Sequence, residues 1–303
     1  MNEPDPNELL LDELLRTLDC RWEALPDKPG ETASASLRAL WFSASGDRRS
    51  VEAAGRDALP VLGLDDFRRL RALIDERHAG KPLAHLTGRQ HFLGLELEAS
   101  PEALVPRKET EILATAALRL LDGLVRERGS AQVLDLCTGG GNLAIALAHY
   151  EPRCEVCAAD LSPDALRLAR ANAIRHGLDG RVRFFEGDLF HPFASPALRQ
   201  QFDPIVCNPP YISTAKVAEL PSETGRHEPR LAFDGGAFGL NVIGRLMQEA
   251  PAHLKPGSWL CFEVGRGQGD YLCGCLQKNK AYAEVRNVLD HQNIVRALTA
   301  RTV

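Results

Sequence analysis

The chain has 303 residues, of which 44% are hydrophobic, and a formal net charge of −5; this size allows one large domain and a second small one. The acidic balance provides no overall positive charge for binding a nucleic-acid backbone. No apolar run is long enough for a membrane span, and residues 1–7 lack the basic and then apolar pattern of a signal peptide. We therefore expect a cytoplasmic protein that has no membrane or nucleic-acid partner.

The eight cysteines are too sparse for a disulfide scaffold. Cys154 and Cys157 have the spacing of a metal-binding pair, but the segment that contains them predicts a strand, in which these two positions face opposite sides. No second pair of Cys or His has zinc-finger spacing. We expect thiols in all eight positions and no metal site.

Residues 1–80 predict a small helical domain. Leucines at helical spacing predict helices over residues 8–20, 33–43 and 64–78. Between the first two, Pro and Gly in residues 25–32 predict a loop. Residues 81–110 predict a connector, in which alternating residues up to Leu97 indicate a β-hairpin.

From residue 111 to 303, strands and helices alternate, which predicts an α/β domain with a doubly wound, mostly parallel sheet. The expected strands are 132–136, 153–159, 182–186, 205–207 and 259–264, followed by an antiparallel hairpin over 283–289 and 294–301. The expected helices are 109–127, 143–150, 162–176, 240–254 and 268–278.

Polar residues follow the predicted strands, at the edge where such sheets bind ligands. The motif Asp135-x-Cys137-x-Gly139-x-Gly141 joins a strand to a helix, where the backbone can approach a ligand closely. Asp160 follows about 20 residues after the loop and could accept hydrogen bonds from ribose hydroxyls. Ala144 stands at the last position of the dinucleotide fingerprint, which permits Ala, so the loop alone does not exclude NAD.

The segment Asn208-Pro-Pro-Tyr211 follows the fourth expected strand. Two prolines stiffen the backbone, and a carboxamide offers both a donor and an acceptor. A bare Asn-Pro-Pro is more often a turn that ends a strand. Downstream of the Gly loop, and with Asp188 at the end of the third strand, it instead favours an adenosine-containing methyl donor and a planar NH₂ group held by Asn208.

Taken together, these motifs resemble the class I S-adenosylmethionine-dependent methyltransferases, and within them the N5-glutamine protein methyltransferases that modify release factors or a ribosomal protein. The matching motifs occur in the order Pro82–Gly88, Val105–Arg107, Glu109–Glu111, Asp135–Gly141, Asp160–Ala165, Gly187–Asp188, Asn208–Tyr211, His227–Pro229 and Glu263–Gly265.

This resemblance implies a Rossmann-like methyltransferase sheet of seven strands and S-adenosylmethionine as the cofactor. The cofactor-binding residues that it implies are Asp135, Cys137, Thr138, Gly139 and Gly141 of the loop, Asp160 on the ribose, Asp188 near the adenine, and Asn208 beside the methyl group. It further implies that Asn208 and the Pro209 carbonyl hold the amide of the substrate, with Tyr211 lining the pocket. Residues 1–80 are expected to recognise a protein substrate.

Some positions depart from this pattern. Cys137 and Arg226–Pro229 are typical of the ribosomal-protein branch, Arg230–Gly236 is more similar to the release-factor branch, and Lys108 stands where release-factor enzymes usually have Pro. We expect a release factor as the substrate, with a ribosomal protein as the alternative. Two other classes stay open, an adenine-N6 methyltransferase acting on DNA or RNA and a non-catalytic cofactor-binding module. The sequence does not indicate an oligomeric state.

Several charged residues near these motifs are expected to be structural. Arg107, Glu109 and Glu111 are interpreted as the start of a helix or as packing contacts, and His227 and Glu228 as anchors for the loop that follows the site. Glu263, at the end of a buried strand, is predicted to be a structural hydrogen-bonding group rather than a catalytic acid.

Overall fold

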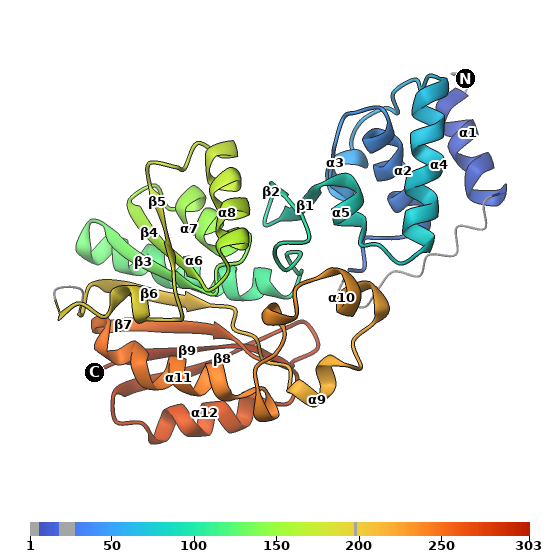
Figure 1. The fold of residues 1–303 in the computed structure, drawn as a ribbon. Coiled ribbons are helices and arrows are strands. Elements are labelled where there is room, and N and C mark those ends of the chain that lie inside the picture. Colours follow the sequence, from blue (N-terminus) through green and yellow to red (C-terminus); the bar gives the residue numbers. More distant parts are fainter. Residues whose placement is uncertain (1–5, 18–27, 197–198) are drawn as a thin grey trace. The chain divides into compact units, whose positions relative to one another are not determined.

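The structure is a computed structural model that describes residues 6–17, 28–196 and 199–303. Contacts between elements divide the chain into two units (Figure 1). The first unit consists of the described residues up to Pro101, together with Val105–Arg107 and Pro221–His227. The second consists of Glu102–Leu104, Lys108–Leu220 and Glu228–Val303. No helix in the described part of the chain is long and apolar enough to cross a membrane.

The first unit is mainly helical. Its elements are α1 (Pro6–Thr17), α2 (Ala33–Ala44), α3 (Val51–Ala54), α4 (Leu64–His78), α5 (Leu83–Thr87), β1 (Arg89–Phe92), β2 (Leu95–Glu98) and α10 (Ser222–His227). Helix α2 begins at Ala33 because the Thr32 side chain accepts a hydrogen bond from Ala35 N. The fully buried Trp41 of α2 packs edge-on against Phe67 of α4, at the centre of this unit's core.

The three helices expected in this unit are present, and α1 ends at Thr17; residues 18–20 of the first expected helix and residues 25–27 of the expected loop lie outside the described residues. The pattern missed α3, α5 and α10. All three are too short to show a helical period, and α5 is capped at its C-terminus by Gly88, whose φ of +68° favours glycine.

Segment α10 joins the first unit through a buried ion cluster. Glu223 accepts hydrogen bonds from Lys28 Nζ and from Arg77 Nη1, both at 2.6 Å. Arg77 also reaches Glu31 Oε2, at 3.3 Å. The side chains of Lys28, Arg77 and Glu31 are 3–7% exposed, so these charges compensate one another away from water.

The second unit is built on a seven-stranded sheet in the order β5-β4-β3-β6-β7-β9-β8. Its strands are β3 (Ala131–Leu136), β4 (Cys154–Asp160), β5 (Val182–Glu186), β6 (Phe202–Cys207), β7 (Leu254–Glu263), β8 (Tyr282–Leu289) and β9 (Val295–Thr302). Strands β3 to β7 are parallel, whereas β9 is antiparallel to both of its neighbours. The predicted fold class, including the closing antiparallel hairpin, is confirmed.

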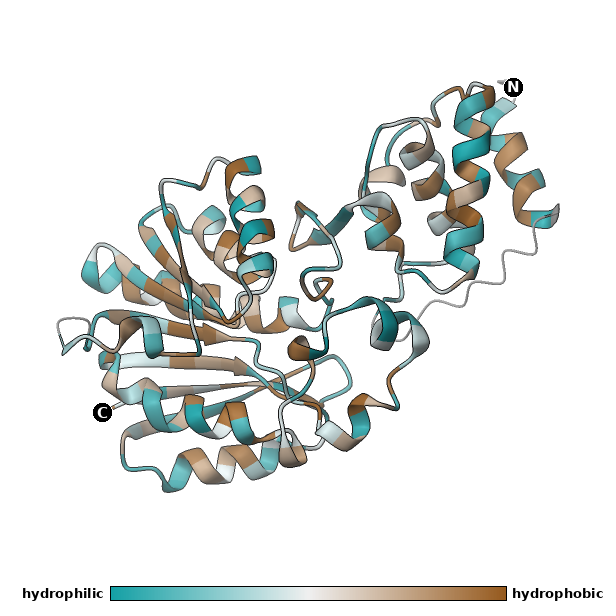
Figure 2. Cartoon of the chain, viewed as in Figure 1, coloured by the Kyte–Doolittle hydropathy of each residue, from teal (hydrophilic) through white to brown (hydrophobic). Residues whose placement is uncertain are grey.

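Helices cover both faces of this sheet (Figure 1). The helices are α6 (Thr110–Arg128), α7 (Asn142–Tyr150), α8 (Pro163–Arg175), the short α9 (Thr214–Val217), α11 (Asn241–Glu249) and α12 (Gly269–Lys278). Neighbours α6, α7 and α8 pack against one another. On the other face, Leu246 of α11 and Leu272 of α12 share a core with strand residues such as Ile205 and Phe262. Figure 2 shows the central strands mainly in brown and the surface helices in mixed colours.

Three boundaries differ markedly from the prediction. The helix expected over 240–254 ends at Glu249 and is followed by a 3₁₀ turn, Ala250–Ala252, because Pro251 lacks an N–H for the α-helical ladder. Strands β6 and β7 begin earlier than expected. Each contains a proline near its start, and the pairing of the two strands changes register between Phe202 and Pro204, which accommodates Pro204.

Candidate active site

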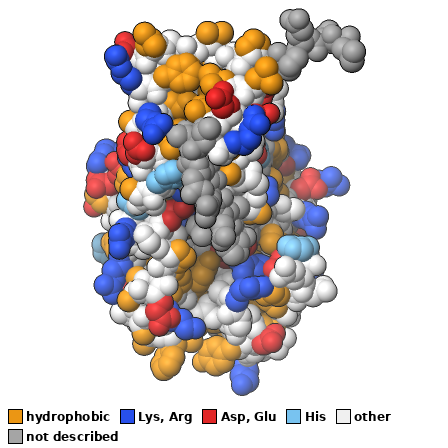
Figure 3. All heavy atoms as spheres, turned by 90° about the vertical axis from the view of Figure 1, so that its right-hand side faces the viewer, with side chains coloured by type: hydrophobic (Ala, Val, Ile, Leu, Met, Phe, Trp, Pro, Cys, Tyr) orange, Lys and Arg blue, Asp and Glu red, His pale blue; other side chains and the backbone are white. Residues whose placement is uncertain are grey.

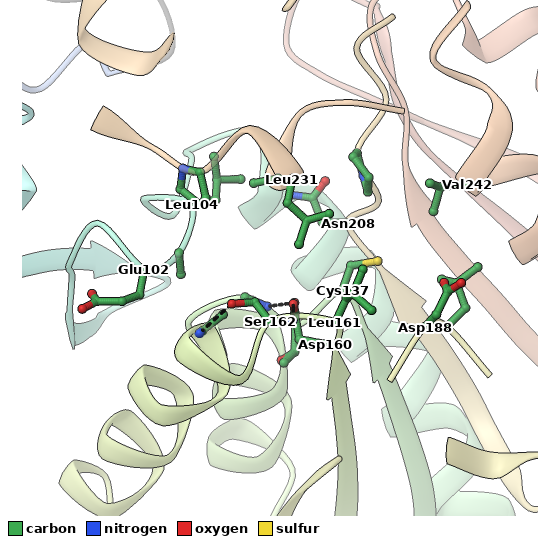
Figure 4. Close-up of a pocket in the computed structure, with 18 of the residues that line it drawn as sticks. Glu102, Leu104, Cys137, Asp160, Leu161, Ser162, Asp188, Asn208, Leu231 and Val242 are labelled. Carbon is green, nitrogen blue, oxygen red and sulfur yellow. Dashed lines mark hydrogen bonds between the residues drawn. The ribbon is translucent and has the colours of Figure 1, made fainter. Parts of the chain in front are cut away.

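A cavity with a volume of about 150 Å³ lies in the second unit, at the carboxyl ends of β3, β4, β5 and β6 (Figure 4). It is lined by Glu102–Leu104, Cys137–Gly139, Asn142, Leu143, Asp160–Ser162, Ala165, Gly187–Leu189, Asn208, Pro210, Pro229, Leu231, Ala232 and Val242. Chain order runs outward from β3 to β5 on one side and from β6 to β7 on the other, so the cavity lies at the topological switch point between β3 and β6. This is where open α/β sheets bind their ligands.

Asp160 lies in this cavity at the end of β4 (Figure 4). Its Oδ2 accepts from Gly139 N at 2.8 Å, and its Oδ1 accepts from Ser162 N at 2.9 Å. Burial raises the pKa of this carboxyl, and the backbone hydrogen bonds oppose that shift. The side chain therefore fixes the Gly loop and the start of α8, while each oxygen keeps a lone pair for a ligand.

The Gly loop is supported from below by Asp135, which is fully buried. Its Oδ2 accepts from Thr138 Oγ1 at 2.6 Å and from Ala144 N at 3.1 Å, so it ties the loop to α7. Burial raises the pKa of Asp135 to about 7. Gly141 has φ +85°, and a Cβ there would crowd Ala169 and Ile145, so the loop needs glycine at this position.

Asp188 lines the cavity at the end of β5, and its carboxylate is held by Arg245 of α11. Arg245 Nη1 donates to both oxygens, at 3.1 and 2.8 Å. The two side chains are 46% and 52% exposed, so the pair is partly solvated. A charged partner for Asp188 was not predicted from the sequence.

Asn208 brings a carboxamide to the same cavity, directly after β6. Its Nδ2 donates to Thr110 Oγ1 at 3.2 Å. Three residues further on, the Tyr211 hydroxyl donates to Glu263 Oε1 at 3.0 Å, so Glu263 is the structural hydrogen-bonding group that the sequence predicts. Burial and the Glu263 carboxylate raise the pKa of Tyr211 well above its ordinary value, which keeps the phenol protonated.

A second loop packs closely on the backbone of this motif. A Cβ on Gly235 would clash with the Pro210 carbonyl oxygen, and one on Gly239 with that of Tyr211. Gln268 Nε2 completes the contact by donating to the Tyr211 carbonyl at 3.0 Å. The backbone after Asn208 is therefore held by its own prolines and by glycine contacts from a segment about 30 residues away in sequence.

The cavity collects most of the predicted site residues but not all. Cys137, Thr138, Gly139, Asp160, Asp188 and Asn208 line it, whereas Asp135, Gly141, Pro209 and Tyr211 do not. Of these four, Asp135 and Gly141 support the Gly loop from within, whereas Pro209 and Tyr211 belong to the segment that carries Asn208.

Sequence reasoning missed the apolar walls of the cavity. Leu104, Leu161, Leu189, Leu231 and Val242 belong to these walls. Leu161 and Leu231 are 51% and 49% exposed, unusually high for residues of their type. Only Leu161 had a signal in the sequence, because it stands between Asp160 and the helix cap Ser162.

The described residues contain no group of three or more His, Cys, Asp or Glu side chains that could hold a metal ion. Seven of the eight cysteines are free thiols, and Cys20 lies outside the described part of the chain.

Known proteins are similar to this chain in sequence and in fold. A family model described as "Methyltransferase small domain" matches residues 112–222. The release factor glutamine methyltransferase of Geobacter sulfurreducens is 40% identical over 217 residues, which cover 72% of this chain and 72% of that protein. The ribosomal protein uL3 glutamine methyltransferase of Bradyrhizobium diazoefficiens is 40% identical over 196 residues, which cover 62% of this chain and 59% of that protein.

Among solved structures, the catalytic domain of hMettl16, in complex with an RNA hairpin, matches with a TM-score of 0.52. The match covers 81% of this chain and 84% of that one at 14% identity, so it shows the fold alone. The doubly wound sheet with a cavity at its switch point is compatible with several classes of nucleotide-binding enzyme; the match to the methyltransferase model and to the curated relatives places the chain among the S-adenosylmethionine-dependent methyltransferases. Within that class, 40% identity across 72% of a curated relative places the chain firmly: it belongs to the protein glutamine methyltransferases. This confirms the family resemblance found in the sequence.

Proposed function

We propose that this protein transfers the methyl group of S-adenosylmethionine to the side-chain amide nitrogen of a glutamine in a protein of the translation apparatus, with a peptide chain release factor as the first candidate substrate. The observation that carries the proposal is the position of Asn208, whose carboxamide lines the same cavity as Asp160 and the Gly loop. The cavity therefore contains both a side chain that can bind an amide, Asn208, and groups that can bind a nucleoside, Asp160 and the Gly loop.

The residues of the cavity fit the cofactor. Asp160 retains acceptor capacity for ribose hydroxyls beside its two backbone hydrogen bonds. Leu161, Leu189 and Val242 provide apolar surface for an adenine ring. The loop of Cys137 to Gly139 would adjoin the methionine part. When bound, S-adenosylmethionine supplies an electrophilic methyl group on a sulfonium.

The remaining task of the protein is to make an amide nitrogen react. Its lone pair is delocalised into the carbonyl, so it is a poor nucleophile. In our proposal the two N–H groups of the glutamine donate to Asn208 Oδ1 and to the Pro209 carbonyl, which orients the nitrogen and favours its rehybridisation. The substrate nitrogen would bond to the methyl carbon as the sulfur–methyl bond of the cofactor breaks, and the positive charge on the methylated amide would be relieved by loss of one N–H proton to solvent.

The choice of substrate rests on the relatives and on charge. The chain covers more of the release factor enzyme, 72%, than of the uL3 enzyme, 59%. The ribosomal protein is therefore the second candidate. Adenine in a nucleic acid is disfavoured by the net charge of −5. On the face shown in Figure 3, basic and acidic side chains are interspersed rather than separated by sign.

We assign recognition of the protein substrate to the first unit. The match to the general methyltransferase model begins at residue 112, after most of this unit. A unit that the shared catalytic domain does not include is a reasonable source of substrate selectivity.

The test uses methyl-labelled S-adenosylmethionine with purified release factor and purified uL3 in separate reactions, followed by peptide mass spectrometry. We expect label on a glutamine of the release factor. Asn208→Ala should reduce turnover by about a hundredfold or more, while cofactor binding by calorimetry survives. Label on uL3 alone would select the second candidate. Label only on adenine in added RNA or DNA, or full turnover by Asn208→Ala, would contradict the amide mechanism.

A further inference from the structure

A buried polar cluster lies behind the Asn208 to Tyr211 segment, within the second unit. It contains Thr110, the first residue of α6, and Glu263, the last residue of β7, which are 1% and 2% exposed. Asn208 Nδ2 contacts Thr110 Oγ1 at 3.2 Å, and the Tyr211 hydroxyl contacts Glu263 Oε1 at 3.0 Å. The second oxygen, Oε2 of Glu263, is buried and accepts no hydrogen bond from the described residues.

The donors and acceptors of this cluster restrict the directions that its hydrogen bonds can take. An ionised carboxylate only accepts, and a threonine hydroxyl has a single proton. The Tyr211 hydroxyl donates to Glu263 Oε1, and the nearby Thr110 hydroxyl also acts on this carboxylate, so both oppose the rise that burial causes in the pKa of Glu263. The Thr110 oxygen accepts from Asn208 Nδ2, so its own proton points elsewhere, and the neighbouring Glu263 carboxylate favours that proton. Asn208 must then present its NH₂ group to Thr110.

Shape alone would not set this orientation, because the oxygen and nitrogen of an asparagine amide are nearly the same size. A reversed amide would place Oδ1 against the Thr110 oxygen and would leave two acceptors facing each other. Only the hydrogen-bond network distinguishes the two orientations. With Nδ2 engaged by Thr110, Oδ1 is the group of Asn208 available to accept an N–H from the substrate.

We propose that Thr110 and Glu263 are positioning residues, which fix the orientation of the Asn208 carboxamide so that its oxygen accepts from the substrate nitrogen. This inference rests on the proposed role of Asn208 in binding an amide. The same carboxylate also fixes Tyr211, so one buried group orients both ends of the Asn-Pro-Pro-Tyr segment.

Charges around the cluster act on the pKa of Glu263 in both directions. Arg296 is 9% exposed, and its positive charge lowers the pKa of Glu263. Its guanidinium also lies 3.6 Å from Glu109 Oε1. Glu109 raises the pKa of Glu263, so Arg296 compensates a second acidic neighbour as well.

The experiment compares Thr110→Val, which keeps the shape of the side chain and removes the hydroxyl, with Thr110→Ser, which keeps the hydroxyl. We expect Thr110→Val to lower kcat by about tenfold or more, the equivalent of one hydrogen bond, and Thr110→Ser to restore most of it. Thr115→Val is the matched control, because Thr115 lies on the same helix and its hydroxyl donates to a backbone oxygen, Glu111 O, at 2.7 Å rather than to the cluster. Affinity for S-adenosylmethionine and the unfolding midpoint should stay near wild type in all three.

Glu263→Gln tests the polarity of the network. A glutamine can donate to Thr110, which frees the Thr110 proton to face Asn208 and favours the reversed amide. We expect Glu263→Gln to lower kcat as Thr110→Val does, with the cofactor still bound. In an Asn208→Ala background, Thr110→Val should cause no further loss, because the group that it positions is gone.

The outcomes separate this inference from the proposed function. If the wild type methylates an acceptor other than glutamine, the proposed function is wrong, and the same comparison on that acceptor still tests the positioning. Equal activity of Thr110→Val and Thr110→Ser, or additive losses with Asn208→Ala, would overturn the positioning role. A wild type that transfers no methyl group to protein or nucleic acid would overturn both.

Discussion

Arg245 donates to both carboxylate oxygens of Asp188, at 3.1 and 2.8 Å, on the rim of the cavity. Asp188 is the residue expected near the adenine of the cofactor. Its negative charge is already paired with the positive charge of Arg245. The pair joins α11 to the end of β5, which are 57 residues apart at these positions. Arg245 either competes with the ligand for Asp188 or remains bound to Asp188 without affecting the ligand. The affinity for S-adenosylmethionine distinguishes these two cases.

We expect Arg245→Met to change the affinity for S-adenosylmethionine by less than about fivefold, because a half-exposed ion pair contributes only about 0–1 kcal/mol. Asp188→Ala removes the acceptor itself and should weaken binding by about tenfold or more. Isothermal titration calorimetry measures both. Tighter binding by Arg245→Met, by more than that margin, would show that the arginine competes with the ligand.

The anchor role of Asp160 predicts a different pattern. In Asp160→Asn, one oxygen becomes an NH₂ group that faces a backbone N–H, either of Gly139 or of Ser162. We expect cofactor affinity to fall by about tenfold to a hundredfold, because the loop and the ribose contact are affected together. Substrate turnover at saturating cofactor should fall less. A variant that keeps its cofactor affinity but loses turnover would assign Asp160 to catalysis instead.

The Asp135 carboxyl predicts a pH dependence of stability. Burial raises its pKa from 3.8 to about 7. Between these values the folded protein holds a proton that the unfolded chain has released, so this contribution to stability is present at low pH and is lost as the pH rises through about 7. In Asp135→Asn the side chain does not titrate, so the variant lacks this pH-dependent contribution to stability. Relative to the variant, the wild type should become less stable by about 4 kcal/mol between pH 4 and 8.

Urea unfolding of both proteins at several pH values measures this difference. Comparing the two cancels the other carboxyl groups, whose pKa values shift in either direction. A difference in unfolding free energy that stays constant from pH 4 to 8 would contradict the buried, partly protonated state of Asp135.

The sequence predicted the ligand-binding edge of the sheet well, for a local reason. Asp160 and Asn208 each follow a short apolar run and precede a helix cap or a proline, so strand, break and polar group stand within a few residues of one another. The parallel order of the strands then brings these ends together. The fold class and the positions of Asp160 and Asn208 at this edge follow from these local patterns, whereas the roles of the site residues are implied by the family resemblance and stay predictions.

The contacts that hold these residues could not be predicted in the same way. Thr110 meets Asn208 across 98 positions in the chain, and Glu223 meets Lys28 across 195. A single Thr or Glu carries no pattern that indicates its partner. The apolar lining residues could not be predicted either. No sequence pattern distinguishes Leu231 from other leucines, because its position beside the cavity depends on the fold of the loop that carries it. Contacts between residues far apart in the chain depend on the tertiary fold, so local sequence patterns do not predict them.

The pairing of Glu223 with Lys28 and Arg77 gives the last prediction. Segment α10 follows the Asn208 loop in the chain, yet its only described charged partners are in the first unit. Glu223→Ala would leave two buried cations with Glu31 as their remaining close acidic partner, which typically costs about 3–5 kcal/mol. Amide hydrogen exchange in α2 and α4, read by mass spectrometry, should accelerate accordingly. Asp65→Ala is the matched control, because it breaks the exposed ion pair with Arg68 in the same unit. It should change the opening free energy, as reported by hydrogen exchange, by no more than about 0.5 kcal/mol. Equal exchange in the two variants would mean that water or a neighbouring group compensates the buried charges, and that α10 contributes little to the stability of this unit.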